Sequence, residues 1–375
     1  METDDQAALG GASPKPVVCF LGPTSSYTHQ ATMQVFPADQ FNLMPVTTIK
    51  DIFDTTQSGG ATYGVVPFEN STNGSVVFTL DNFADRSNLY GDLNVCREIY
   101  LDVHHYLVGY IAPQPPAPHH PSSTPTSVDA HAQESGVDEE AGDGGQRDKT
   151  KRSQPLHPIS HVRRVYSHPQ AFGQCTEFMG SWLRGIETVD VSSTSRAAEL
   201  ALADSTGESA AISSAVAAEQ LGLDVLAQNI EDRDDNTTRF FVLRKGVDGG
   251  AGVFAPTASR NASPTALNTQ RDNEEEDDAE LLSRTKSLLS FTVPHRSPGA
   301  LADVLSCFRR GGLNLTSINS RPSLAGAAAF EYIFFVEFEG HRFRDPRARV
   351  ARVLEDVAAV ARTSRWLGSW ENMAK

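Results

Sequence analysis

Polar side chains cluster where apolar runs of the sequence end, and their types suit the binding of a small acid. Hydroxyl and amide groups predominate in these clusters, with one carboxylate and one guanidinium. The clusters occupy residues 24–26, 69–71, 192–195, 213–214 and 236–239. In α/β proteins, helix N-termini at the carboxyl ends of strands offer free N–H groups to anions. Helix capping explains any single cluster, but the recurrence of the pattern predicts a site for a small organic acid.

The signatures of common cofactor and metal enzymes are missing from the sequence. No GxGxxG, GxxxxGK, GxSxG or HExxH motif occurs, which argues against a nucleotide cofactor, a nucleophile elbow and a zinc helix. Cys19, Cys96, Cys175 and Cys307 are scattered without metal-ligand spacing and are expected to be buried thiols. We therefore expect neither a cofactor nor a metal.

Bulk properties indicate a globular protein. The chain has 375 residues and a net charge of −15, which argues against nucleic acid as a partner. No stretch reaches the roughly 18 apolar residues of a membrane helix, and the most apolar run, residues 327–338, is interrupted by Glu331 and Glu337. The acidic N-terminus lacks the profiles of signal and transit peptides. We expect a cytoplasmic protein without a membrane partner.

Composition divides the chain into ordered blocks and three segments of low hydrophobicity. Residues 1–16, 112–158 and 246–285 are rich in Pro, Gly, Ser and acids, so they bury too little apolar surface to offset their ordering entropy. The two internal segments are either tolerated disordered insertions, which we favour, or regulatory tails. The ordered blocks are then residues 17–245, interrupted by an insertion, and residues 286–375.

Residues 17–245 alternate strand and helix patterns, which predicts mainly parallel sheets. The first helix follows an apolar run and a Gly-Pro turn, with Thr24 or Ser25 as its expected cap. Residues 286–375 instead read strand, helix, strand, strand, helix, strand, the ferredoxin-like βαββαβ order. Its first helix is expected to have Ser297 as cap, Pro298 in its first turn and Gly311 past its end.

Six motifs in order resemble the prephenate dehydratase family: FLGPTSSYTHQA, GVVPFENSTNGSV, YSHPQAFGQC, STSRAAELA, AAISS and NTTRFFVL. The last contains that family's Thr-Arg-Phe signature. KSLLSFTVPHRSPGALADVL and LNLTSINSRPS look like the ACT domain that ends such enzymes. The resemblance covers both ordered blocks.

The resemblance implies a fold, an activity and partners. It implies an α/β catalytic region of two lobes, periplasmic-binding-protein-like (type II), with the cleft between the lobes. The chain would cross near residues 98–105 and return near 230–240, and the ferredoxin-like ACT domain would follow. It implies cofactor-free conversion of prephenate to phenylpyruvate, carbon dioxide and water, L-phenylalanine as effector, and a homodimer or homotetramer joined through ACT domains. About 16 residues precede Val17, too few for the chorismate mutase domain of some relatives, so a monofunctional enzyme is expected.

The resemblance also assigns site residues. Thr238 is expected at the departing hydroxyl, as donor and proton relay. Arg239 either binds a carboxylate or forms a structural ion pair, and Glu69 is either a general acid raised in pKa by burial or a helix cap. The expected substrate-binding residues are Ser26, Asn70, Ser71, Gln170, Thr194 and Phe240. His29, on the polar side of its helix, and His168, which is expected to brace a turn before a proline, are weaker candidate acids.

The effector pocket is expected in the last block. It would be formed by Pro298, Gly299, Ala300 and Leu301 together with Asn319, Ser320, Arg321 and Pro322. Relatives usually carry Glu where Asn319 stands, so effector affinity is expected to be weaker. In the first loop, relatives usually carry Gly-Thr-Phe where Ser25, Ser26 and Tyr27 stand, and Ser26 keeps the hydroxyl. Two other functions stay open, namely an arogenate dehydratase and a non-catalytic protein that senses an amino acid.

Overall fold

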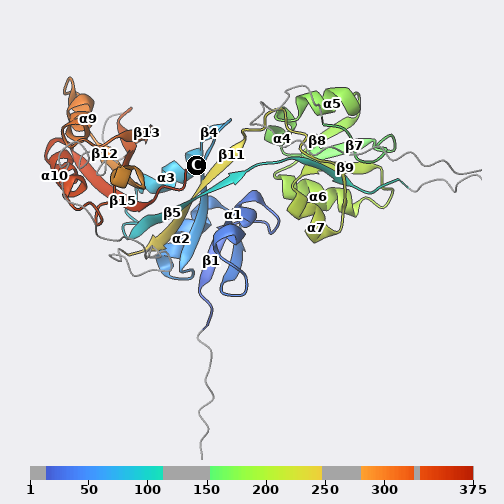
Figure 1. The fold of residues 1–375 in the computed structure, drawn as a ribbon, viewed down its shortest axis with the longest axis horizontal. Helices are drawn as coiled ribbons and strands as arrows, with labels where there is room; N and C mark the ends of the chain where they lie inside the picture. Colours follow the sequence, from blue (N-terminus) through green and yellow to red (C-terminus); the bar gives the residue numbers. More distant parts are fainter. Residues whose placement is uncertain (1–13, 113–152, 247–279, 325–329, 375) are drawn as a thin grey trace, which may run out of the picture. The chain divides into compact units, whose positions relative to one another are not determined.

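The computed structural model describes residues 14–112, 153–246, 280–324 and 330–374, which form two compact units (Figure 1). The first unit comprises Met1–Val103 and Arg233–Lys375, and the second comprises His104–Asp232. The chain thus crosses from one unit to the other at residues 103–104 and returns at 232–233. Both crossings lie within the ranges predicted from the sequence.

The first part of the first unit is a sheet flanked by helices. Its strands are β1 (Val17–Leu21), β2 (Asn42–Val46), β3 (Tyr63–Asn70), β4 (Gly74–Ser75), β5 (Leu93–Asp102) and β11 (Thr237–Lys245). Its helices are α1 (Tyr27–Val35), α2 (Ile49–Ser58) and α3 (Val77–Phe83). β1 pairs in parallel with β2 and β3, whereas β11 lies antiparallel between β3 and β5. This pairing brings the polar ends of β3 and β11 together.

Local signals explain where these helices begin and end. α2 has a capping box in which Thr48 and Asp51 bond each other's backbone N–H, and it ends at Gly59 with a φ of 82°. The expected cap of α1 was wrong by one or two residues: Ser26 accepts the N–H of His29, while Ser25 has a φ of 75° and lies in the preceding turn.

The second unit is a smaller α/β layer. Its strands are β6 (Tyr106–Gly109), β7 (Arg164–Ser167), β8 (Glu187–Asp190), β9 (Ser209–Ser213) and β10 (Asp224–Ala227), in the order β10-β6-β9-β7-β8. Its helices are α4 (Pro169–Gly173), α5 (Thr176–Trp182), α6 (Thr194–Ala203) and α7 (Ala215–Leu221). Ser193 and Ser214 cap α6 and α7 through their hydroxyl oxygens, so helix capping accounts for these two clusters.

The prediction of mainly parallel sheets was wrong, because both sheets are mixed. β7 pairs in parallel with β8 and β9, but β6 runs antiparallel to both β9 and β10. Within the strands β1 to β11, every antiparallel pair except β3–β4 includes β6 or β11, the strands next to the two crossings. Strand and helix alternation alone did not reveal that these strands reverse direction.

The C-terminal segment, residues 285–371, has the predicted βαββαβ order. Its elements are β12 (Thr285–Thr292), α9 (Ala300–Arg310), β13 (Leu315–Pro322), β14 (Tyr332–Glu339), α10 (Arg349–Val360) and β15 (Thr363–Glu371). Its strands lie in the order β13-β14-β12-β15. The expected capping of α9 by Ser297 was wrong, because Gly299 is the N-cap with a φ of 82° and the helix begins at Ala300. Gly311 does follow its last residue.

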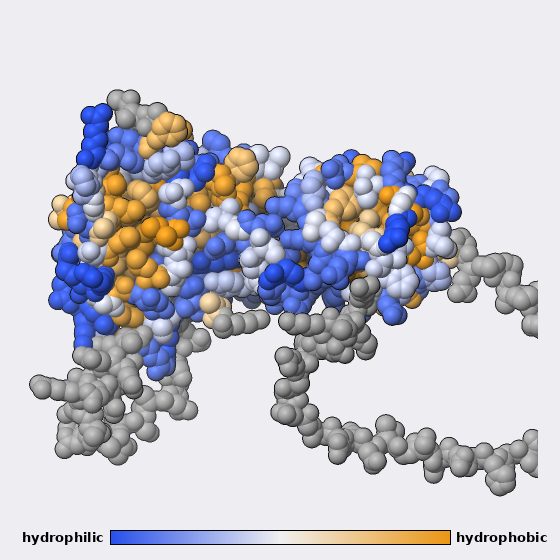
Figure 2. Space-filling model, turned by 90° about the horizontal axis from the view of Figure 1, so that it is seen from above, coloured by the Kyte–Doolittle hydropathy of each residue, from blue (hydrophilic) through white to orange (hydrophobic). Residues whose placement is uncertain are grey.

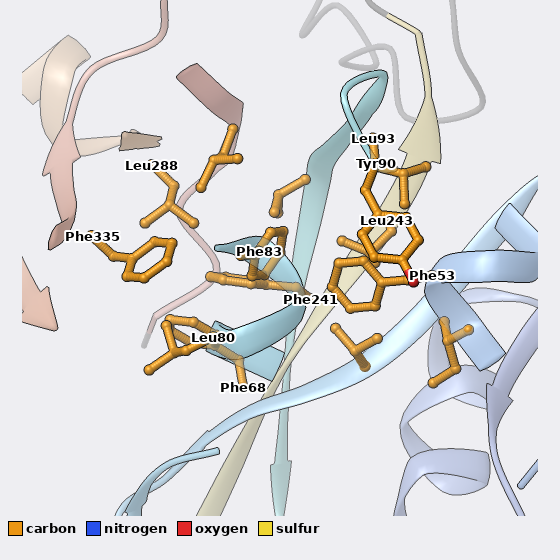
Figure 3. Packing of buried hydrophobic residues seen from close by; sticks show 14 of the residues in the cluster. Phe53, Phe68, Leu80, Phe83, Tyr90, Leu93, Phe241, Leu243, Leu288 and Phe335 are labelled. Atoms are coloured by element: carbon orange, nitrogen blue, oxygen red, sulfur yellow. The ribbon is translucent and has the colours of Figure 1, made fainter. Parts of the chain in front are cut away.

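The C-terminal segment shares a hydrophobic core with the rest of the first unit. α9 and α10 pack against one face of its sheet. The other face contributes to a hydrophobic cluster that contains Phe241 (Figure 3), through Leu288, Phe335, Leu367 and Trp370. The rings of Phe241 and Trp370 lie 5.0 Å apart. The sheets join where Gly368 of β15 pairs with Val95 of β5, so close that a Cβ at Gly368 would lie 2.1 Å from the Val95 carbonyl oxygen.

The predicted low-hydrophobicity segments lie mostly outside the described residues. Their predicted limits reach into structured parts of the chain, however. Pro155 forms a β-bridge with Ala227, and the buried Leu282 precedes β12. None of the described helices is long and apolar enough to cross a membrane.

Candidate active site

Thr238 and Asn70 form a hydrogen-bonded pair on neighbouring strands. The ends of β3 and β11 place the two residues opposite each other, and the Asn70 Nδ2 donates to the Thr238 Oγ1 at 2.9 Å. Both side chains are partly exposed. Across the described residues, no group accepts a hydrogen bond from the Thr238 hydroxyl. That hydroxyl therefore retains a hydrogen to donate.

Asn70 is held by bonds on both sides of its amide. Its Nδ2 also donates to the Asn236 Oδ1 at 2.8 Å, and its Oδ1 accepts from the Thr72 hydroxyl at 2.7 Å and the Asn73 N–H at 3.0 Å. Ser71 closes the loop by donating to the Asp235 carbonyl at 2.8 Å. Asn70 and Ser71 were predicted as substrate donors, but in the structure they bond to residues 235–238 and orient the segment that carries Thr238.

Arg239 occupies a buried cluster of charges on the opposite face of β11 from Thr238. Glu98 on β5, Glu337 on β14 and Lys286 on β12 surround it, and the four residues are between 1% and 6% exposed. Arg239 donates to Glu98 at 2.6 and 2.9 Å and to Glu337 at 2.5 Å. Of the two predicted roles, the structure therefore shows the ion pair.

The charges within this cluster balance. Lys286 lies 3.4 Å from Glu98 and 3.6 Å from Glu337, which gives two cations and two carboxylates. Burial disfavours the charge on Arg239, but attraction to Glu337 and Glu98 outweighs it and holds the pKa of Arg239 above its usual value. Glu69 stands at the rim, 39% exposed, with its Oε2 3.9 Å from Arg239.

Glu69 is not a helix cap. The nearest following helix, α3, has Val76 as its N-cap and lacks a side-chain cap bond. Glu69 ends β3 beside Asn70, opposite Arg239 in the register of the two strands. Its carboxylate faces both the Arg239 cluster and solvent.

Ser26 and His29 are engaged within α1. The Ser26 hydroxyl donates to the Leu21 carbonyl at 2.9 Å and accepts the His29 N–H at 3.2 Å, so its hydrogen is committed. His29 was predicted on the polar side of its helix, which was wrong. It is 7% exposed, stacks on Phe20 at 4.8 Å, and accepts the Ser25 N–H on Nδ1 at 3.1 Å. Burial lowers the pKa of His29.

Phe240 is a core residue and not part of an exposed site. It is 1% exposed and packs with Phe20, Ile99 and Val242. The alternation along β11 directs Phe240 into this core, while a bulge between Arg239 and Phe240 relative to β3 adjusts the register. The prediction of Phe240 as a substrate contact is therefore corrected.

Gln170 and Thr194 belong to the second unit. Gln170 is exposed in α4, whose N-cap His168 accepts the Gln170 N–H on Nδ1 at 3.2 Å. This confirms that His168 braces a turn. Thr194 begins α6, is partly exposed, and its carbonyl accepts the Ser213 hydroxyl at 2.9 Å.

The predicted effector residues lie on two elements of the C-terminal segment. Pro298 and Gly299 are exposed before α9, which Ala300 and Leu301 begin. Asn319, Ser320, Arg321 and Pro322 end β13. This end of β13 contacts the first part of the unit: Arg321 donates to Asp81 of α3 at 2.8 and 3.0 Å, and the Asn319 Oδ1 accepts the Ser75 hydroxyl at 2.7 Å.

Sequence reasoning missed the partners of Arg239. Glu98, Lys286 and Glu337 were not among the candidates, although Glu337 was noted as an interruption of an apolar run. A charged residue inside a strand that is otherwise apolar is a usable signal, because a buried charge requires a partner. The partners come from three distant segments, so their identity was not readable from local sequence.

The described cysteines are free thiols, as expected. Cys19, Cys175 and Cys307 are buried and Cys96 is partly buried. Burial raises the pKa of Cys19 to about 11 and that of Cys96 to about 12, so neither is a ready nucleophile. In the described part of the chain, no three His, Cys, Asp or Glu residues are grouped to hold a metal ion.

Fold and site together define a two-unit α/β protein whose candidate site is a hydroxyl framed by amides. The family model described as prephenate dehydratase matches residues 18–118 and 152–247. A bifunctional chorismate mutase/prephenate dehydratase of Aquifex aeolicus is 30% identical over 353 residues, covering 94% of this chain and 73% of that protein. The chain belongs to the prephenate dehydratase family.

Two further comparisons agree with this membership. A probable prephenate dehydratase of Saccharomyces cerevisiae is 28% identical over 349 residues and covers 86% of each chain. The crystal structure of a prephenate dehydratase from Arthrobacter aurescens in complex with L-Phe is 26% identical, with a TM-score of 0.65. That likeness covers 95% of this chain and 90% of the other.

Proposed function

We propose that this enzyme converts prephenate to phenylpyruvate, and that Thr238 acts on the departing hydroxyl. The observation that carries the proposal is the bond from Asn70 to the Thr238 oxygen at 2.9 Å, which leaves the Thr238 hydrogen to donate. A hydroxyl that accepts a hydrogen bond becomes a stronger donor, because chained bonds polarise one another. Membership of the prephenate dehydratase family supports the substrate.

The reaction needs little beyond placement of donors. Prephenate carries a ring carboxylate and, across the ring, a hydroxyl group. When the bond to the carboxylate carbon breaks, carbon dioxide leaves and the electron pair completes the aromatic ring. The carbon–oxygen bond breaks in the same process, and the departing oxygen takes up a proton to leave as water. A donor at that oxygen stabilises the charge that develops there.

Other groups serve the substrate's carboxylates in this proposal. Arg239 is committed to Glu98 and Glu337, so we assign it no substrate contact. Gln170 and Thr194 are exposed or partly exposed in the second unit, and no bond to either side chain occurs within the described chain. These two are the proposed neutral donors. Glu69 lies opposite Arg239 and faces the Arg239 cluster, so in this proposal it does not act on the oxygen at Thr238.

For the architecture, we propose a periplasmic-binding-protein-like catalytic region followed by an ACT domain. Two α/β units joined by two crossings support the first assignment. The βαββαβ order and the strand order β13-β14-β12-β15 support the second. The edge strand β13 exposes Leu315 and Ile318, and Figure 2 shows hydrophobic surface over the C-terminal elements. Both features favour a homodimer or homotetramer through this segment, which light scattering would test.

For regulation, we propose that L-phenylalanine binds near the start of α9 and the end of β13. The free N–H groups of α9, which lacks a side-chain cap, suit a carboxylate, and the related Arthrobacter aurescens structure is a complex with L-Phe. Calorimetry on Gly299→Trp tests the site. Gly299→Ala is the matched control, since both variants share the strain of a φ of 82° and only Trp adds bulk. If Gly299→Trp and Gly299→Ala bind L-phenylalanine with equal affinity, the effector site does not include the start of α9.

The direct test of function offers the purified enzyme prephenate and arogenate in parallel. Ultraviolet absorbance should report phenylpyruvate from prephenate, at a higher kcat/KM than for phenylalanine from arogenate. Preference for arogenate would reassign the substrate. Turnover of neither would favour a protein that only senses an amino acid.

A further inference from the structure

The charge cluster around Arg239 is built from both parts of the first unit. Arg239 and Glu98 come from β11 and β5, whereas Glu337 and Lys286 come from the C-terminal segment. Each carboxylate oxygen has a partner. Glu337 Oε2 accepts from Arg239 at 2.5 Å, and its Oε1 accepts from the Thr316 hydroxyl at 2.8 Å. Thr316 on the neighbouring strand β13 thus fixes the Glu337 carboxylate, which accepts a hydrogen bond from Arg239 with its other oxygen.

The second carboxylate is tied to the C-terminal segment as well. Glu98 Oε1 accepts the backbone N–H of Met373 at 2.7 Å and lies 3.4 Å from the Lys286 ammonium. The guanidinium also lies over the rings of Phe68 and Phe241, 5.4 and 4.8 Å from their centroids. Arg239 is therefore held in place on all sides, and half of the charges that hold it come from the C-terminal segment.

Arg239 directly follows Thr238 on β11, so the bonds that anchor Arg239 also constrain the backbone beside the hydroxyl. We propose that Glu337 of the C-terminal segment is a positioning residue for Thr238, acting through Arg239. This inference rests on the proposed function of Thr238. It means that the C-terminal segment is part of what makes the site competent, and not only a place where an effector binds.

A second contact places the same segment beside Asn70. The β3–β4 hairpin pairs Asn70 with Gly74 and Glu69 with Ser75, and Ser75 donates to the Asn319 Oδ1 at 2.7 Å. The C-terminal segment therefore contacts Arg239, which follows Thr238, and Ser75, which pairs with the residue before Asn70.

Neutralising Glu337 would leave the cluster with two cations and one carboxylate. Arg239 would lose one of its two anchors, and repulsion from Lys286 would favour its displacement. A small misplacement of a reacting group can reduce turnover strongly without touching substrate affinity. The expected signature is therefore a loss in kcat at nearly constant KM.

The experiment compares Glu337→Gln with Glu339→Gln in the full chain. Glu339 lies two residues further along β14 and has no ion-pair partner among the described residues. Glu337→Gln should lower kcat about tenfold to hundredfold, with KM changed by less than about threefold. Glu339→Gln should behave as the parent. Parental kcat in folded Glu337→Gln would overturn the proposal.

The double variant Glu337→Gln with Lys286→Met covers the case in which the single variant does not fold. It leaves Arg239 and Glu98 as a neutral pair, so its melting temperature should return towards the parent while kcat stays low. Recovery of kcat together with stability would show that only charge balance matters, and would overturn the positioning role.

Thr238→Ala in the same assay separates the two claims. If Thr238→Ala is inactive while both Glu337 variants have parental kcat, the inference fails and the proposed function stands. If Thr238→Ala turns over normally, the proposed site itself fails.

Discussion

The side-chain amide of Asn70 donates to the hydroxyl of Thr238 across 2.9 Å, although the two residues are 168 positions apart in the chain. The antiparallel pairing of β3 with β11 creates this contact. Because Asn70 is itself held by Asn236 and Thr72, the Thr238 oxygen is fixed from one side and its hydrogen is directed elsewhere.

Asn70→Ala should lower kcat by about tenfold or more, because Thr238 would lose the donor that orients and polarises it. Asn82→Ala is the matched control, since among the described residues the Asn82 side chain bonds only the Phe78 carbonyl of its own helix. Steady-state kinetics with circular dichroism gives the comparison. If folded Asn70→Ala has the same kcat as Asn82→Ala, then Asn70 does not orient Thr238 for catalysis.

Gly368→Ala should destabilise the first unit, because the new Cβ would lie 2.1 Å from the Val95 carbonyl oxygen where β15 meets β5. A cost of about 1–3 kcal/mol is typical of such backbone strain, and each kcal/mol lowers the melting temperature of a unit this size by roughly 2–4 °C. Scanning calorimetry measures the shift. A Cβ at Gly91 would have no atom within 4 Å, so Gly91→Ala should have the melting temperature of the parent. Equal melting temperatures for the two variants would contradict the close contact between Gly368 and Val95.

Protonation of the buried His29 side chain should lower the free energy of unfolding at acidic pH. Burial lowers the pKa of His29 below 6.5 in the folded state, so the unfolded chain binds the proton more readily. Between the folded pKa and about 6.5, the free energy of unfolding therefore rises with pH, and the contribution is lost as pH falls through this window. NMR titration gives the pKa, and urea unfolding of the parent and of His29→Gln at pH 5 and 7.5 gives the stability. A His29 pKa at or above 6.5 would contradict this prediction.

The sequence predicted polar sites at the end of β3 and the start of β11, because a cluster of polar residues borders the apolar run of each strand. It also predicted the βαββαβ order of the last block. These features depend on local spacing, caps and turns. Local signals were sufficient there because neighbouring residues determine the element.

The roles of individual side chains depended on contacts that local spacing does not carry. Phe240 was read as a substrate contact from its motif, but strand alternation buries it. Arg239 was left between two roles, because Glu98 and Glu337 lie 141 and 98 positions away. The strand directions were misjudged for the same reason, since antiparallel pairing of β11 joins segments that are distant in sequence.

The most direct test of the account is the turnover of prephenate by Thr238→Ala and Thr238→Ser. The alanine variant should fold as the parent does and lose about 100-fold or more in kcat, because a donor at the departing oxygen is gone. The serine variant keeps the hydroxyl and should retain far more activity. A folded Thr238→Ala enzyme that forms phenylpyruvate within a few-fold of the parental rate would contradict the assignment of the active site.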